Sequence, residues 1–355
     1  MTEAGTNTDA NAFSGTGRTT QQLLDQIGAS WMSQAIGVAA ELQLADRLSA
    51  GPRSVPQLAR DAGCNEDALR RLLHALTSLE IFKELEDGRF ALDDAGRHLC
   101  GDAPQSLRHW AIWCAHYHWP IWADLLDSVR TGRSARQLKG VDAGASGYAH
   151  IERDPHGAAV FNQAMVEITG LIAAGLVSAC EWEQVKHVVD VGGGYGGVIA
   201  ALLAAQPAMR GTLFDLPHAM EGAAAHLARA GVDARCALVS GSFFEAVPAN
   251  GDVYLMKSIL HNWDDERCKE ILVQCRRAMR SDAKLLLVER VMPARLGTAL
   301  SDRAIARSDL NMLVSLTGHE RTTDELRHLL DAAGFSLNEL RPVWREFSVL
   351  EAVPR

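Results

Sequence analysis

The sequence lacks the features of a disulfide-bonded or zinc-stabilised protein. It has seven cysteines among 355 residues, an odd number without any CxxC pair: Cys64, Cys100, Cys114, Cys180, Cys236, Cys268 and Cys275. Thiols scattered in this way predict neither a disulfide framework nor a structural zinc site. We therefore expect reduced cysteines and a cytoplasmic location.

The sequence also lacks an excess of basic residues and long apolar runs. Its net charge of −9 argues against nucleic acid as the main partner, because phosphate neutralisation needs Lys and Arg. No apolar run approaches the roughly 20 residues that span a bilayer. The segment 1–17 is small and polar, has no signal-peptide core and is expected to be a disordered tail. We expect a globular protein with neither nucleic acid nor membrane as its partner.

Residues 18–183 are predicted to be nearly all helical. The apolar residues of the first segment recur at helical spacing: Leu23, Leu24, Ile27, Trp31 and Ile36. Further along, Ser54 is placed to begin a helix that Gly63 ends, and Asn65 begins a second helix. The stretch "IFKELEDGRFAL" then predicts a hairpin around its Asp-Gly turn. Helix, turn, helix and hairpin form a winged-helix pattern.

A winged helix has two interpretations. The module could bind DNA, since its second helix carries Arg70, Arg71 and His74. It could instead pack a subunit interface. The acidic charge balance and the large domain that follows favour the interface, so we expect a dimerisation domain.

From residue 184 the pattern changes to alternating strands and helices, which is typical of a doubly wound, mainly parallel sheet. The predicted strands are "KHVVDVGG", "GTLFDL", "ARCALVSG", "GDVYLMKS", "KLLLVERV", "FSLNELRPV" and "REFSVLEAV". Helices are expected near 196–205, from Pro217, from Asp264 to Met279, and over 322–334.

A glycine loop follows the first of these strands. "DVGGGYGG" has the spacing Asp190-x-Gly192-x-Gly194-x-x-Gly197, and the next strand ends in Asp215. Such a loop lets the backbone approach a ligand at a helix N-terminus, and the acid can accept hydrogen bonds from ribose hydroxyls. The combination predicts a nucleoside cofactor.

The loop alone fits NAD as well as S-adenosylmethionine. Two features favour S-adenosylmethionine. Asp190 stands two residues before the first glycine, as in the sulfonium-binding version of this turn. The chain also finishes with a helix and two strands, which suits the terminal hairpin of a methyltransferase sheet.

Over residues 20–353 the sequence resembles the two-domain, S-adenosylmethionine-dependent small-molecule O-methyltransferases, which include plant caffeic-acid-type and bacterial antibiotic-tailoring and phenazine-type enzymes. Seven stretches carry the resemblance: "FNQAM", "VVDVGGGYGG", "LFDLPHA", "GSFFEAVP", "LMKSILHNWDDERC", "LLLVERVMP" and "DLNMLVSLTGHERT". Family members are typically homodimers whose N-terminal domains interlock.

The resemblance implies roles for individual residues. Those near the cofactor would be Gly192, Gly193 and Gly194 at its methionine end, Asp215 and Leu216 at its ribose, Ser242 and Phe243 at its adenine, and Lys257 and Ser258 nearby. Those lining the acceptor pocket would be Phe161, Asn162, Met165, Asn311 and Met312. Ser242 departs from the family, which usually has Asp before the two phenylalanines.

The resemblance also implies that His261 is the general base, with Glu289 and Glu320 beside it. A phenol with a pKa near 10 is only about 0.1% ionised at neutral pH, so a neutral imidazole that takes its proton can accelerate transfer by about 10²- to 10⁴-fold. A carboxylate on the far ring nitrogen would fix the tautomer. Which of the two glutamates does so stays open.

A tryptophan-rich stretch, "HWAIWCAHYHWPIW" at 109–122, allows two interpretations. It could be a core or dimer helix, or part of it could roof the acceptor pocket through Trp113 and Trp119. Its histidines have no carboxylates at metal-ligand spacing, so we predict no metal site.

The sequence therefore predicts an α/β fold: a Rossmann-like class I methyltransferase domain with a mostly parallel seven-stranded sheet at 184–355, preceded at 18–183 by a mainly α winged-helix dimerisation and substrate-lining domain. The expected function is O-methylation of an aromatic, polycyclic secondary metabolite. N-methylation of a phenazine-like heterocycle, a non-methylating family member and a DNA-binding regulator are the alternatives.

Overall fold

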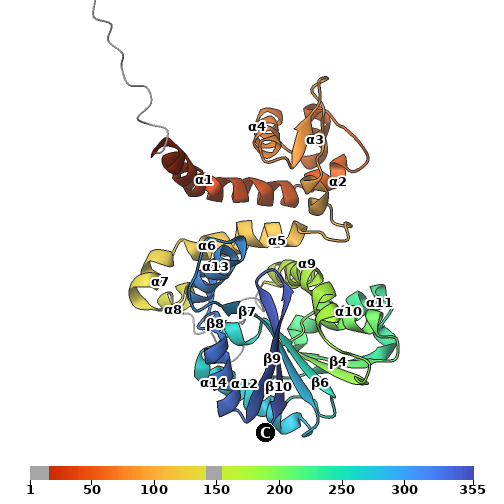
Figure 1. Ribbon diagram of the computed structural model, residues 1–355. Helices are drawn as coiled ribbons and strands as arrows, with labels where there is room; N and C mark the ends of the chain where they lie inside the picture. Colours follow the sequence, from red (N-terminus) through yellow and green to blue (C-terminus); the bar gives the residue numbers. More distant parts are fainter. Residues whose placement is uncertain (1–15, 141–153) are drawn as a thin grey trace, which may run out of the picture. The chain divides into compact units, whose positions relative to one another are not determined.

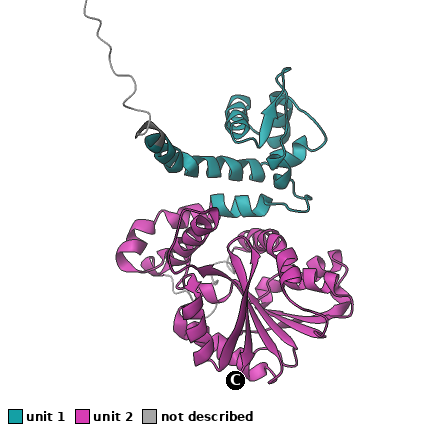
Figure 2. Cartoon of the chain, in the orientation of Figure 1, with its two compact units in different colours: residues 1–115 teal, residues 116–355 magenta. Residues whose placement is uncertain are grey.

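The computed structural model describes residues 16–140 and 154–355 (Figure 1). The chain divides after Ala115 into two compact units (Figure 2). The tail expected at 1–17 lies outside the described residues as far as residue 15, and helix begins at Thr16.

The first unit is built of helices and one hairpin. Its elements are α1 (Thr16–Glu41), α2 (Leu44–Leu48), α3 (Val55–Ala62), α4 (Glu66–Thr77), β1 (Phe82–Glu84), β2 (Phe90–Leu92), a 3₁₀ turn (Ala95–Leu99) and α5 (Arg108–Trp113). Gln57 accepts the Ser54 N–H at 3.0 Å at the start of α3, Gly63 ends it with φ 66°, and Asn65 accepts the Ala68 N–H at the start of α4. The predicted helix-turn-helix-hairpin order is confirmed.

The apolar side of α1 faces away from the core of its own chain. Leu23, Leu24, Ile27 and Trp31 are 57%, 57%, 64% and 71% exposed. The helix therefore forms where the spacing of the apolar residues predicts it, but these four side chains form a row that the core does not cover.

The second unit contains the predicted seven-stranded sheet, in the order β5-β4-β3-β6-β7-β10-β9, with a two-residue β8 beside β7. The strands are β3 (His187–Val191), β4 (Arg210–Asp215), β5 (Cys236–Ser240), β6 (Val253–Lys257), β7 (Lys284–Met292), β8 (Arg321–Thr322), β9 (Phe335–Trp344) and β10 (Phe347–Pro354). The five strands β5, β4, β3, β6 and β7 pair with their neighbours in parallel. β10 runs antiparallel to both β7 and β9.

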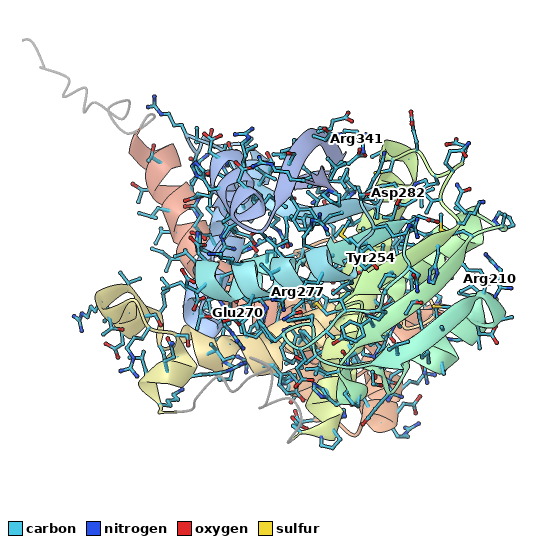
Figure 3. All side chains as sticks on the ribbon, turned by 90° about the horizontal axis from the view of Figure 1, so that it is seen from below. Arg210, Tyr254, Glu270, Arg277, Asp282 and Arg341 are labelled. Carbon is cyan, nitrogen blue, oxygen red and sulfur yellow. The ribbon has the colours of Figure 1, made fainter. Side chains whose placement is uncertain are left out.

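Helices cover both faces of this sheet (Figure 1). The helices of the unit are α6 (Trp119–Trp122), α7 (Leu125–Thr131), α8 (Ala135–Leu138), α9 (Pro155–Ala179), α10 (Gly197–Ala205), α11 (Ala223–Arg229), α12 (Asp265–Ala278), α13 (Leu300–Ser315) and α14 (Thr323–Ala332). One buried cluster joins α12 and α14 to the sheet, and a second joins α9, α10 and α11 to it. Figure 3 shows α12 with the exposed Glu270 and Arg277, and Tyr254 of β6 fully buried.

α9 differs from expectation in two respects. By length and composition alone it could cross a membrane, so the expectation that no apolar segment approaches that length was wrong. It packs against α10 and β9 and buries Ile172 and Leu176, as a core helix does. Because α9 packs on the sheet in this way, the compact units divide near residue 115 rather than at the 183/184 change of sequence pattern.

Candidate active site

The predicted cofactor and base residues gather where the sheet order reverses. β3 lies between β4 and β6, and ligands of open α/β sheets bind at such a point, beyond the carboxyl ends of the strands. β3 leads into the glycine loop, β4 ends at Asp215, and β6 ends at Lys257. The fold therefore places these segments at one edge.

The glycine loop has space only for glycine at two positions. Gly192 has φ 73°, and a Cβ there would lie 2.5 Å from Cδ1 of Ile259. A Cβ on Gly193 would lie 2.6 Å from the Asp190 carboxylate. Gly194 also has a positive φ of 56°. Glycines at these positions let the backbone of the loop come close to a ligand.

Asp215 is held by the backbone of the loop itself. Its two carboxylate oxygens accept the N–H groups of Gly194 at 2.8 Å and Leu216 at 2.7 Å. Burial raises the pKa of Asp215, and these two N–H groups oppose that rise. Each oxygen keeps a further lone pair, which suits the two hydroxyls of a ribose.

An aromatic cluster follows β5. Phe243 and Phe244 pack edge to face with their ring centroids 4.9 Å apart, and Trp263 packs on Phe244 at the same distance. Ser242, where the family usually has Asp, accepts the Phe244 N–H at 3.3 Å.

Asp190 of β3 and Lys257 at the end of β6 lie close enough for the charge of each to affect the pKa of the other. Asp190 is 1% exposed, and its Oδ2 has no hydrogen-bond partner among the described residues. Burial, with the Asp215 charge nearby, raises the pKa of Asp190 to about 7. Burial, with Arg290 nearby, lowers the pKa of Lys257 to about 8. Ser258, which follows, has φ 55°.

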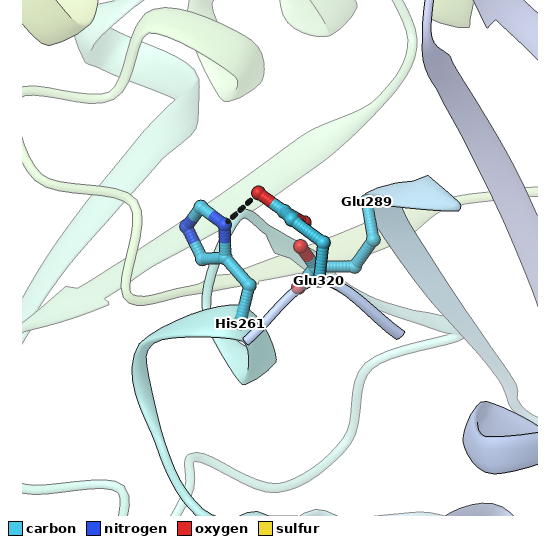
Figure 4. A group of neighbouring side chains, drawn as sticks. All are labelled: His261, Glu289 and Glu320. Atoms are coloured by element: carbon cyan, nitrogen blue, oxygen red, sulfur yellow. Dashed lines mark hydrogen bonds and ion pairs between the residues drawn. The ribbon is translucent and has the colours of Figure 1, made fainter. Parts of the chain in front are cut away.

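His261 lies in a short turn, Leu260–Asn262, and its ring contacts Glu320 (Figure 4). The distance from Nδ1 to Oε1 is 2.9 Å, and both side chains are buried. Ser308 of α13 donates to the same oxygen at 2.5 Å, and Arg290 lies 3.8 Å from it. Although burial raises the pKa of Glu320, the His261 ring, Arg290 and Ser308 outweigh it and lower that pKa. Glu320 is thus the carboxylate that contacts the ring.

Glu289 contacts the backbone of the turn rather than the His261 ring. Its Oε1 accepts the backbone N–H groups of Ile259 at 3.0 Å and Leu260 at 2.9 Å. Burial, opposed by His261 and reinforced by Glu320, raises the pKa of Glu289. Within the described part of the chain its Oε2 has no partner. Glu289 therefore anchors the turn that carries His261.

The same three side chains could also hold a metal ion, because one ligand atom from each of His261, Glu289 and Glu320 lies within 4.8 Å of the others. An ion would compete for the His261–Glu320 hydrogen bond. The prediction that no metal is needed thus calls for a direct test.

The residues expected to line the acceptor pocket lie on four helices. Phe161, Asn162 and Met165 lie on α9, Asn311 and Met312 on α13, Trp119 at the start of α6, and Trp113 in α5 of the first unit. Trp113 is buried, whereas Trp119 is 46% exposed. Asn311 accepts the indole N–H of Trp122 at 3.0 Å.

Sequence reasoning missed Trp122, Ser308 and Arg321. Ser308 precedes Asn311 by one helical turn, so the period of α13 could have indicated it. Trp122 closes the tryptophan-rich stretch, in which residues Cys114–His118 form a π-helical turn; such turns are frequent at functional sites. For Arg321, next to Glu320, no signal in the sequence was apparent.

The fold and the glycine loop define the class: a doubly wound α/β transferase of the methyltransferase type. The chain belongs to the S-adenosylmethionine-dependent O-methyltransferases. Residues 122–336 match the O-methyltransferase domain family, and residues 24–102 match the O-methyltransferase dimerisation domain family.

Close relatives cover almost the whole chain. Phenazine O-methyltransferase PhzM of Lysobacter antibioticus is 39% identical over 332 residues, covering 94% of this chain and 95% of that protein. The crystal structure of LaPhzM has a TM-score of 0.89 at 38% identity and covers 95% and 99% of the two chains. A third match is the crystal structure of NcsB1, an O-methyltransferase from neocarzinostatin biosynthesis, in complex with S-adenosylmethionine and 2-hydroxy-5-methyl naphthoic acid. It has a TM-score of 0.74 at 31% identity, and the match covers 91% of this chain and 96% of that chain.

Relatives at similar identity carry other activities. An 8-amino-8-demethylriboflavin N,N-dimethyltransferase of Streptomyces davaonensis is 31% identical over 88% of this chain and 89% of its own length. The aclacinomycin 10-hydroxylase RdmB of Streptomyces purpurascens is 33% identical over 93% of this chain and 89% of its own length.

Proposed function

We propose that this enzyme methylates a hydroxyl of an aromatic, polycyclic secondary metabolite, with His261 as general base. The observation that carries the proposal is the buried contact between His261 Nδ1 and Glu320 Oε1 at 2.9 Å. The names of PhzM and NcsB1, which refer to a phenazine and to a naphthoic acid, support an aromatic acceptor.

The geometry supports a simple division of work. When bound, S-adenosylmethionine supplies an activated methyl group on a sulfonium. Glu320 accepts a hydrogen bond from the Nδ1–H of His261, which leaves Nε2 as the basic nitrogen. While the acceptor oxygen is methylated, Nε2 would take the proton of the acceptor hydroxyl. Glu320 then stabilises the imidazolium ion.

The described residues fit this cofactor. The glycine loop Gly192 to Gly194, with Asp190 beneath it, would hold the methionine end. Asp215 and Leu216 would hold the ribose, Ser242 and Phe243 would flank the adenine, and Lys257 and Ser258 would lie near it. The unpartnered Oδ2 of Asp190, among the residues described, suits a cationic ligand. Ser242 would bond the adenine amine as a neutral partner.

The acceptor pocket that we propose is lined by Phe161, Asn162, Met165, Asn311 and Met312, with Trp113 and Trp119 as a roof. We also propose a homodimer formed through the N-terminal domain, because α1 leaves Trp31 and its apolar neighbours exposed and residues 24–102 match a dimerisation domain. Trp31→Glu should then convert the dimer to a monomer in sedimentation experiments. The seven unpaired cysteines support a cytoplasmic location.

The proposal is tested by His261→Ala with Asn262→Ala as its neighbouring control. The first variant should keep its affinity for S-adenosylhomocysteine in calorimetry and lose methyl transfer by about 10²- to 10⁴-fold. Near-normal turnover would refute the role of His261 as base but not the methyltransferase assignment. Labelled cofactor, screened against hydroxylated phenazines, naphthoates and polyketide aromatics, identifies the acceptor.

N-methylation is the second candidate, favoured by the riboflavin-modifying relative. A neutral nitrogen acceptor needs no base before transfer, so a rate independent of His261 on an amine would support it. The hydroxylase relative raises a non-methylating role, and failure of every acceptor to gain label while the cofactor binds would favour that alternative. The presence of His261, Glu289 and Glu320 together favours methyl transfer.

A further inference from the structure

Arg321 is a buried cation that the proposed chemistry does not use. It is 2% exposed. Its guanidinium donates to the carbonyl oxygens of Leu260 at 2.9 Å and Trp263 at 2.7 Å, and to Asp265 Oδ1 at 2.8 and 3.0 Å. The two carbonyls lie on either side of His261 and Asn262. The planar fork of an arginine can bridge two such acceptors, which the single ammonium of lysine cannot do in the same geometry.

The turn that carries His261 is held from several sides. Glu289 accepts the N–H groups of Ile259 and Leu260, while Arg321 donates to carbonyls of the same turn. The buried thiol of Cys268 lies 3.1 Å from the Leu260 oxygen and 3.5 Å from the Trp263 oxygen, so it contacts the same two carbonyls. The carboxylate of Glu289 thus binds the N–H groups of this turn, and the guanidinium of Arg321 binds its carbonyl groups.

The segment that carries Arg321 lies directly on this turn. A Cβ on Gly318 would be 2.3 Å from the His261 oxygen and 2.5 Å from the Trp263 nitrogen, so the two backbones touch. Arg321 itself is paired with Val291 of β7. Glu320, its neighbour, contacts the His261 ring. Two consecutive residues therefore contact the ring and the backbone of one histidine.

We propose that Arg321 is a positioning residue for the base: Glu320 orients the imidazole, and Arg321 fixes the backbone from which it projects. The proposal rests on the proposed function of His261. Without the guanidinium, the Trp263 carbonyl keeps only the weak thiol donor of Cys268, and the Leu260 carbonyl keeps that thiol and the Trp263 N–H of its own turn. The turn is then less firmly held, and the ring can leave its line to the acceptor. A misplacement of about 1 Å can cost about 10²-fold in rate.

The test compares Arg321→Met, Arg321→Lys and Asp265→Ala in the full chain. Asp265→Ala is the matched control, because it removes the ion pair and leaves both carbonyl contacts of Arg321. We expect kcat of Arg321→Met to fall about 10- to 100-fold, that of Arg321→Lys to fall less, and that of Asp265→Ala to stay within about twofold. The KM for S-adenosylmethionine should not change in any of them.

Nitrogen NMR of ¹⁵N-labelled histidine supplies the readout that a merely structural residue would not move. The Nδ1–H tautomer of His261 should dominate in the unmodified enzyme and in Asp265→Ala, and should be mixed in Arg321→Met. A folded Arg321→Met enzyme with unchanged kcat and tautomer overturns the proposal. If both Arg321 variants fail to fold, the residue supports the whole unit and the positioning role is wrong. Full activity of His261→Ala would instead overturn the proposed role of His261 as general base.

Discussion

Replacing Asp190 with Asn should stabilise the cofactor-free protein, and the gain should grow with pH. The carboxyl is 1% exposed, and its pKa is raised from 3.8 to about 7, first by burial and then by Asp215. Since the folded pKa is raised, the neutral acid favours folding at low pH. That contribution is lost as pH rises through about 7.

The magnitude follows from the two pKa values. A rise of about 3 units corresponds to about 4 kcal/mol of unfolding free energy lost by about pH 8. About 2 kcal/mol of this loss falls between about pH 5.5 and pH 8. A unit of this size shifts its melting temperature by about 2–4 °C per kcal/mol. Asp190→Asn should therefore melt higher than the unmodified protein by an extra margin of about 4–8 °C at the upper pH.

The assay is thermal melting of cofactor-free protein at the two pH values, with Asp252→Asn as control. Although burial raises the pKa of Asp252, hydrogen bonds from Arg280 and two backbone N–H groups lower it overall, so its effect should be flat over this range. S-adenosylmethionine should stabilise the unmodified protein far more than Asp190→Asn, because the variant lacks the carboxylate that we propose beside the cationic methionine end of the cofactor. A melting difference independent of pH would refute the reasoning.

Three further outcomes are expected. Glu320→Gln should keep cofactor affinity and lower kcat by about 10- to 100-fold, because an amide does not stabilise the imidazolium of His261; a rate within about twofold of the unmodified enzyme would contradict this. Trp113→Ala and Trp119→Ala should each raise the KM for the acceptor, and unchanged values for both in a folded dimer would remove the roof hypothesis. EDTA should leave methyl transfer intact, whereas a loss that added Zn²⁺ or Mg²⁺ restores would assign a metal to the group around His261.

Much of the sheet could be predicted because its strands are buried on both faces. The apolar run of β6, for example, has Val253, Tyr254, Leu255 and Met256 at 0–2% exposure, and such runs leave a clear signal. A mostly parallel seven-stranded sheet was expected from this pattern and from the family resemblance, whereas the order β5-β4-β3-β6-β7-β10-β9 comes from the structure alone. The division between the units could not be predicted, because α9 is helical like the segment before it and joins the sheet only through packing.

The arrangement of the candidate active site could be predicted only in part from the sequence. His261 and Glu320 stand in short family stretches, so their proximity could be inferred. The separate tasks of Glu289 and Glu320 depend on which atoms meet: one carboxylate contacts N–H groups and the other contacts a ring. The clamp of Arg321 on the Leu260 and Trp263 carbonyls is equally invisible, since no spacing rule links a cation to backbone oxygens about 60 residues earlier.

The position of β10 has a consequence for how the protein comes to be made. β10 lies between β7 and β9, although it follows both along the chain, and β9 has no other strand neighbour in the described sheet. During translation, the edge of β7 that pairs with β10 therefore stays unpaired until residues 347–354 have left the ribosome. β9 can join the sheet only after β10 has paired with β7. A chain released early would present that edge, which bears Glu289, to proteases and to other nascent chains. The strand that completes the sheet is thus among the last segments of the chain to be synthesised.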